Sequence, residues 1–81
     1  MIIRSQNKRQ IVKFEKATAC ENGDVYISGN YMGTYSTEEK AIKVLDMIQS
    51  AYNSIETMKI DKGAWRDNHY FQMPSDEEVE V

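Results

Sequence analysis

The stretch from Tyr31 to Ile48, YMGTYSTEEKAIKVLDMI, decides the fold. Its first five residues suit an extended strand, and they run directly into a helix start. Ser36 is a good N-cap residue, and Glu39 three positions later completes a capping-box pattern. Glu38 and Glu39 also place negative charge in the first helical turn, where the helix dipole favours it. The sequence therefore predicts a strand followed at once by a helix.

Apolar residues after this cap recur at steps of four and three, as one face of an α-helix requires. The stripe consists of Ala41, Leu45, Ile48, Tyr52 and Ile55, widened by Val44 and Ala51. The opposite side of the same segment is polar. This pattern predicts one amphipathic helix over about residues 37–58, lying with its apolar side on a sheet.

Short segments separated by turn signals predict that sheet. The strand-like segments are residues 1–5, 11–14, 25–28, 31–35 and 70–73. Asn22-Gly23 is the strongest turn signal, because this pair tolerates the positive φ angles of a tight hairpin, and Gly29-Asn30 offers a second turn. Residues 15–20 continue a strand only after a bulge, and Pro74 ends the last strand.

The predicted fold is α+β, with an antiparallel sheet of about five short strands and the long helix packed on one face. The last strand, about residues 70–73, is expected to return to the sheet beside the first. Residues 1–75 are expected to form a single domain, and residues 76–81 an acidic C-terminal tail.

Composition excludes several classes of protein. The chain has 81 residues, of which 41% are hydrophobic and 28% charged, as in a globular domain. A single cysteine, Cys20, excludes an internal disulfide and a multi-cysteine metal site. No apolar run is long enough for a signal peptide or a membrane span. We therefore expect a cytoplasmic protein.

Charge is distributed unevenly along the chain. Of thirteen acidic residues, four lie in the last six positions, which leaves nine elsewhere against ten Lys and Arg. Those four are Asp76, Glu77, Glu78 and Glu80. They are a possible acidic contact for a basic partner, a solubilising run, or a segment that lies against Arg4, Lys8 and Arg9.

Residues with catalytic or metal-binding chemistry are sparse. Cys20 and His69 are the only nucleophile–base pair of this type, and nothing in the sequence brings them together. Asp61, Asp67 and His69 are too few and too scattered to predict a metal site. No phosphate-binding loop or other catalytic motif occurs. We predict no catalytic residues, no cofactor and no metal, and hence no enzyme.

Two groups of residues are possible partner contacts. Trp65, Arg66 and His69 concentrate residue types that dominate interface hot spots, although in so small a domain capping of the core is the favoured role for Trp65. Tyr31 and Tyr35 fall on one face of their strand by simple alternation, and they are further partner-contact candidates.

The basic N-terminal third offers a different contact. Arg4, Lys8, Arg9 and Lys13 lie near Phe14 in the sequence. Cations interleaved with aromatic residues on a sheet are typical of nucleic-acid platforms, so these four are possible nucleic-acid contacts. The negative net charge of −3 argues against strong binding of this kind.

Three segments of the chain, MIIRSQNK, GTYSTEEKAIKVLDMI and FQMPSDEEVEV, carry a resemblance. Together they resemble a group of small proteins of unknown function from Gram-positive Firmicutes and their phages or integrated elements. The resemblance implies a short cytoplasmic domain of mobile-element association, and it brings no catalytic residues.

The expected function is a non-enzymatic interaction module that binds another protein or a second copy of itself. One alternative is a phage-encoded modulator of a host nucleic-acid machine, for example an inhibitor of CRISPR immunity, in which acidic side chains substitute for phosphates. Another alternative is a weak nucleic-acid binder that uses the basic N-terminal strands.

Overall fold

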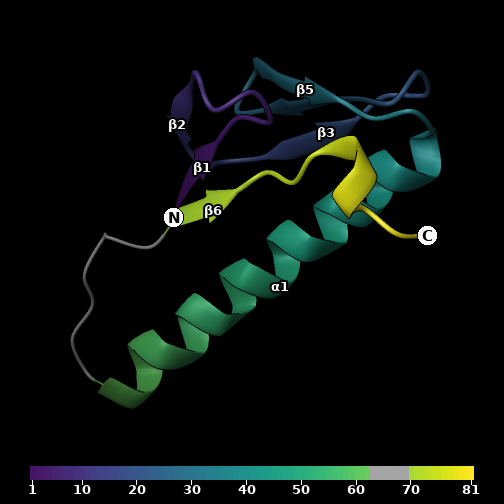
Figure 1. Ribbon diagram of the computed structural model, residues 1–81. Coiled ribbons are helices and arrows are strands. Elements are labelled where there is room, and N and C mark those ends of the chain that lie inside the picture. Colours follow the sequence, from purple (N-terminus) through teal and green to yellow (C-terminus); the bar gives the residue numbers. More distant parts are fainter. Residues whose placement is uncertain (63–69) are drawn as a thin grey trace.

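The computed structural model describes residues 1–62 and 70–81, and it describes side chains for 1–54 and 70–81. The fold is α+β, as predicted, and consists of two three-stranded sheets and one long helix (Figure 1). Its elements are β1 (Ile2–Arg4), β2 (Ile11–Lys13), β3 (Ala17–Ala19), β4 (Asp24–Ile27), β5 (Asn30–Thr34), α1 (Glu38–Lys62), β6 (Tyr70–Gln72) and the short 3-10 helix η1 (Asp76–Glu78).

Sheet A has the strand order β2-β1-β6. The last strand lies beside the first, as predicted, but it is parallel to β1, whereas β2 is antiparallel. A parallel pair needs a long crossover connection, and the chain between β1 and β6 contains all of sheet B and α1. The predicted single antiparallel sheet is therefore replaced by a mixed sheet and a second, antiparallel one.

Sheet B has the order β3-β4-β5 and is built from two tight turns. Gly23 has a φ of 94°, which confirms the predicted Asn22-Gly23 turn. The second turn places Ser28 and Gly29 at φ 52° and 84°, so its two central residues lie one position earlier than predicted. Both central residues at positive φ give the turn type whose twist matches a hairpin.

A β-bulge interrupts the pairing of β4 with β5. Tyr26 pairs with Tyr31 and Val25 pairs with Gly33, so Met32 is an extra residue on β5. An extra residue inverts the alternation of the residues that follow it. Tyr31 is 47% exposed, whereas Tyr35 is 1% exposed and belongs to the core. The prediction that these two tyrosines share one face is wrong for this reason.

The helix begins one residue later than the capping box predicts. The Lys40 N–H donates to Thr37 Oγ1 at 3.2 Å and the Ala41 N–H donates to the Thr37 carbonyl, so Thr37 is the N-cap. Ser36 instead donates its N–H to Asp76 Oδ1 at 2.7 Å. Because Asp76 of the C-terminal segment bonds to Ser36, the N-cap lies at Thr37.

The predicted apolar stripe packs α1 against sheet B. Ala41, Val44 and Ile48 are at most 1% exposed, while Tyr52 at the far end of the described stripe is 39% exposed. The helix has 25 residues and is about 37 Å long, so its C-terminal turns extend beyond the sheets (Figure 1). The buried core comprises Met1, Ile3, Val25, Ile27, Met32, Tyr35, Ala41, Val44, Ile48, Met73 and Val79.

The acidic end of the chain is folded onto the domain. Val79 is 3% exposed and joins the core, and the buried Tyr35 hydroxyl donates to the Pro74 carbonyl at 2.7 Å. Burial raises the pKa of the Tyr35 phenol, and the charges of Asp76 and Glu78 raise it further. Residues 74–79 lie over the start of α1 (Figure 1). The residues beyond the predicted boundary at residue 75 therefore pack on the domain and do not extend away from it as a free tail.

Gly23 and Gly29 form a matched pair for testing what the first turn requires. A Cβ at Gly23 would lie 2.1 Å from the Tyr35 carbonyl oxygen, whereas a Cβ at Gly29 would meet nothing within 4 Å. Both have positive φ, so Gly29→Ala should cost about 1–2 kcal/mol from the backbone alone. We expect Gly23→Ala to cost roughly 2 kcal/mol more, because the clash is added. Thermal unfolding of both variants measures the difference, and equal melting temperatures would contradict it.

Asp76 makes the stability of the C-terminal segment depend on pH. The Ser36 N–H, with help from the Lys40 ammonium at 3.4 Å, holds the pKa of the Asp76 carboxyl below its ordinary value of 3.8. A lowered folded pKa stabilises the fold above the unfolded pKa, and that stability is lost as pH falls through the folded pKa. We expect Asp76→Asn to melt lower than wild type near neutral pH and to lose less of its melting temperature on acidification.

The neighbouring Glu77→Gln variant removes the same charge from an exposed position and is the control. It should keep the wild-type pH dependence. The role assigned to Asp76 is wrong if both variants show the same melting temperatures across the acid range.

Candidate functional site

The residues with possible catalytic or metal-binding roles are not brought together in the described part of the chain. Cys20 is half-buried and free. His69 and Asp67 lie outside the described residues, as does the side chain of Asp61. Within residues 1–54 and 70–81, no three His, Cys, Asp or Glu side chains cluster as metal ligands would.

Of the predicted partner contacts, the structure describes only Tyr31 and Tyr35. Trp65, Arg66 and His69 lie outside the described residues, and their role stays a prediction. Tyr31 is exposed on the outer face of sheet B, where its ring meets Tyr26 edge-on at 5.7 Å. Tyr35 is buried and offers no surface to a partner.

Strand pairing assembles a surface on the outer face of sheet A. Ile2 pairs with Lys13 and Tyr70, and Arg4 pairs with Ile11 and Gln72. Residues that pair directly across neighbouring strands point to the same face. We call this surface the basic face and define it by Arg4, Ile11, Lys13 and Tyr70. The opposite face of the sheet holds Ile3, Val12 and Phe71, which belong to or pack against the core.

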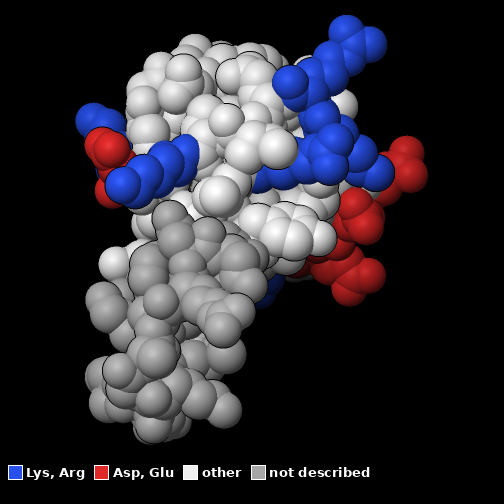
Figure 2. All heavy atoms as spheres, turned by 90° about the vertical axis from the view of Figure 1, so that its left-hand side faces the viewer, with Lys and Arg blue, Asp and Glu red and all other residues white. Residues whose placement is uncertain are grey.

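All four members of the basic face are exposed. Ile11 is 63% exposed and Tyr70 is 71% exposed, which are high values for large apolar side chains. Arg4 and Lys13 are exposed beside them. Figure 2 shows the side of the molecule that carries sheet A, where Lys and Arg side chains stand at the edges of an uncharged area and Asp and Glu side chains lie next to them. The surface thus combines apolar area with positive charge.

The turn between β1 and β2 adds two more cations and is tightly bonded. Arg4 Nε donates to the Lys8 carbonyl at 3.1 Å, and the Lys8 N–H donates to the Ser5 carbonyl at 2.9 Å. Lys8 has a φ of 68°, a conformation that costs a residue with a side chain about 1 kcal/mol. The turn therefore fixes the backbone of Lys8 and Arg9 next to the basic face.

The acidic residues are partly engaged within the chain. Asp76 binds the Ser36 N–H and Lys40. Glu78 accepts the Ser75 N–H at 2.8 Å, and this bond, with a smaller effect from the charge of Lys8, lowers the pKa of its carboxyl. The acidic segment thus forms its ion pair with Lys40 of α1, and the contact predicted with Arg4, Lys8 and Arg9 stays a prediction. Glu77 and Glu80 are exposed.

Gln6 connects the two sheets and was not singled out in the sequence. Its backbone N–H donates to the Met32 carbonyl at 2.9 Å. Its side-chain amide pairs with the backbone of Thr34, accepting the N–H at 3.0 Å and donating to the carbonyl at 2.9 Å. Gln6 lies against Gly33, where a Cβ would come within 2.7 Å of the Gln6 Cβ. Gln6 thereby forms with β5 the hydrogen bonds that a neighbouring strand would otherwise form with the backbone of Met32 and Thr34.

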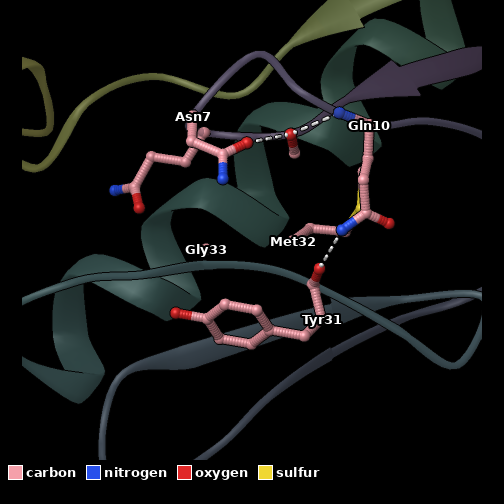
Figure 3. A pocket seen from close by; sticks show the side chains of 7 residues that line it. Asn7, Gln10, Tyr31, Met32 and Gly33 are labelled. Carbon is pink, nitrogen blue, oxygen red and sulfur yellow. Dashed lines mark hydrogen bonds between the residues drawn. The ribbon is translucent and has the colours of Figure 1, made fainter.

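Two hollows flank these elements. A polar pocket of about 200 Å³ lies between the β1–β2 turn and the bulge of β5 (Figure 3). A wider, more open groove of about 430 Å³ runs between Phe14 and α1, where the rings of Phe14 and Tyr52 are 5.7 Å apart. The first is lined by amide side chains, and the second is mainly apolar.

Comparison with protein-family models, with curated proteins and with solved structures gave no match. No helix in residues 1–62 or 70–81 is both long and apolar enough to cross a bilayer.

The sequence analysis identified the four cations. It did not identify Ile11 as an exposed member of the basic face or Gln6 as the link between the two sheets. The alternation of residues 11–14 did separate Ile11 from Val12. Only the pairing of β2 and β6 on either side of β1 shows that Ile11 and Tyr70 share a face with Arg4.

Proposed function

We propose that this protein is a non-enzymatic interaction module that binds a protein partner through the basic face. The observation that supports this most is the exposure of Ile11 and Tyr70, 63% and 71%, on the same sheet face as Arg4 and Lys13. The non-enzymatic part rests on the sequence, which contains no catalytic motif.

Large apolar side chains on a strand face favour association with another protein. Ile11 and Tyr70 lie two strands apart, about 12 Å from each other by strand spacing and rise. Contiguous apolar area with a polar rim is the usual composition of a protein interface, and tyrosine and arginine are enriched in its centre. A protein partner gains from burying both side chains.

Charge complementarity indicates the chemistry of that partner. Arg4 and Lys13 alternate with the apolar side chains, and Lys8 and Arg9 stand in the adjacent turn. A matching surface carries apolar side chains surrounded by Asp and Glu, because opposite potentials steer encounter and fix register. The exposed acids Glu77 and Glu80 of a second copy are one such source, so self-association is an outcome that the experiment must separate.

Nucleic acid is the second candidate, favoured by one specific observation. Four exposed cations, Arg4, Lys8, Arg9 and Lys13, lie on or next to the sheet face that carries the exposed Tyr70 ring, and a base can stack on such a ring. Ile11 contributes nothing to phosphate binding, and the negative charge of Glu78, which acts on Lys8, opposes it. Binding of a protein explains the exposed Ile11 as well as the cations and Tyr70, and it is therefore the favoured function.

Acidic mimicry of nucleic acid has less support. Two of the four acids it requires, Asp76 and Glu78, are hydrogen-bonded within the chain. The association with Firmicutes and their phages and the cytoplasmic location stay predictions from the sequence.

A double variant tests the proposal. Ile11→Thr with Tyr70→Thr removes the apolar area while keeping β-forming side chains, so the fold should be retained. The tagged wild-type protein, the double variant and an Ile42→Gln control are used to capture partners from cell lysate, with and without nuclease treatment. Ile42 is 47% exposed on α1, away from sheet A, and the control removes a comparable apolar side chain.

We expect the control to retain a protein that the double variant loses, with affinity falling at least about tenfold for the purified pair. Light scattering of each variant checks for a dimer of the 9.4 kDa chain. Equal retention by the double variant would contradict the proposal. Binding that disappears with nuclease and weakens steeply with salt would instead assign the surface to nucleic acid.

A further inference from the structure

The polar pocket has an uncommon lining for so small a domain. Ser5, Gln6, Asn7 and Gln10 line it from the side of the β1–β2 turn, and residues 31–33 line it from the bulge of β5. Figure 3 shows side chains from both elements pointing into the same space. Bulges occur often beside binding sites, because they turn backbone and side chains out of the regular ladder.

The walls of this pocket are held by hydrogen bonds. Ser5 is 1% exposed, and its hydroxyl donates to Asn7 Oδ1 at 2.7 Å and accepts the Gln10 N–H at 3.0 Å. Asn7 Oδ1 also accepts the Arg9 N–H at 2.9 Å. Gln10 Nε2 donates to the Tyr31 carbonyl at 3.2 Å. The pocket is therefore shaped before any ligand arrives.

These bonds fix which way each amide points. Asn7 Oδ1 accepts two bonds, so the Asn7 NH2 group must face the other way, and in Figure 3 it points toward β5. Gln6 and Gln10 each donate one Nε2 hydrogen to a backbone carbonyl and keep the second. The Asn7 NH2 has no hydrogen-bond partner among residues 1–54 and 70–81. The pocket thus presents N–H donors whose orientation is settled.

The charges nearby favour an anion. No Asp or Glu lines the pocket, while Lys8 and Arg9 belong to the same turn and Arg4 is bonded to it. These three cations outnumber Glu78, the acid whose charge acts on Lys8. Donors in a positive surrounding bind a charged acceptor more strongly than a neutral one. A volume of about 200 Å³ suits a carboxylate with a short carbon chain.

We propose that this pocket binds a carboxylate, presented by an acidic side chain of the protein partner. The inference rests on the proposed function for the source of that carboxylate, because the turn that forms the pocket also borders the basic face. The pocket then selects one acidic residue of the partner, while Ile11 and Tyr70 bury apolar area.

The test uses the protein alone. Side-chain amide resonances of ¹⁵N-labelled protein are followed by NMR during titration with sodium acetate or with N-acetyl-aspartate amide, and sodium chloride at matched ionic strength serves as the reference. We expect saturable shifts of the Asn7 and Gln10 NH2 groups, with half-saturation at roughly 1–10 mM, and no saturable shift with chloride.

Asn7→Asp is the decisive variant. A carboxylate keeps both acceptor bonds from Ser5 and Arg9 but replaces the NH2 donor with an oxygen, so the turn persists and the pocket repels the ligand. Binding of both carboxylates should weaken at least about tenfold. Gln49→Glu makes the same charge change on the exposed side of α1 and should bind as wild type. If Asn7→Asp does not fold, Gln10→Met, which removes a different donor, must weaken binding instead.

Each other result overturns the inference. Absence of saturable shifts, or undiminished binding by the variant, excludes a carboxylate site. If acetate binds but N-acetyl-aspartate amide does not, the pocket accepts only small free acids, and the proposed link to a partner's side chain is wrong. Tighter binding of inorganic phosphate assigns it to a different anion. The titration contains no partner protein. A negative result therefore rejects the carboxylate pocket but does not affect the test of the basic face.

Discussion

The arrangement of this small domain depends on one extra residue in β5. Met32 has no pairing residue on β4, and the bulge turns both Met32 and Gly33 inward. The inverted alternation sends Tyr35 into the core, where its hydroxyl reaches the Pro74 carbonyl. The displaced Met32 carbonyl accepts the Gln6 N–H, which ties the end of β1 to sheet B. The same local irregularity thus anchors both ends of the chain.

The chain ends complete the fold from opposite directions. β1 is the central strand of sheet A, and β6 pairs with it in parallel after α1 has crossed the core. Beyond β6, Val79 is buried and Asp76 binds the start of α1. A domain of this size buries a limited fraction of its surface, so each of these terminal contacts contributes a noticeable share of its stability.

The two proposed contact surfaces arise from the same connections. Pairing of β2 and β6 on either side of β1 places Ile11 and Tyr70 around Arg4, and the turn that joins β1 to β2 supplies Lys8 and Arg9. That turn is held against the bulge through Gln6 and Gln10, and a hollow lined with amide donors is left between them. Apolar area, positive charge and oriented donors therefore lie next to one another on a rigid frame. Such preorganisation lowers the entropic cost of binding a partner.

The sequence by itself determined the α+β class, the helix with its apolar stripe, the Asn22-Gly23 turn and the four cations near the N-terminus. These features depend on local periodicity, on the conformational freedom of glycine and on charge, all of which can be read from neighbouring residues. The helix cap lies at Thr37 and not at Ser36, because the distant residue Asp76 bonds to Ser36. Tyr35 lies in the interior because the bulge inverts the alternation, and its hydroxyl then bonds to the Pro74 carbonyl. The division into two sheets, the parallel return of β6, the basic face and the pocket were decided by tertiary structure alone. Each depends on pairing between segments far apart in the chain, and a one-residue bulge is enough to exchange the buried and exposed faces of a strand.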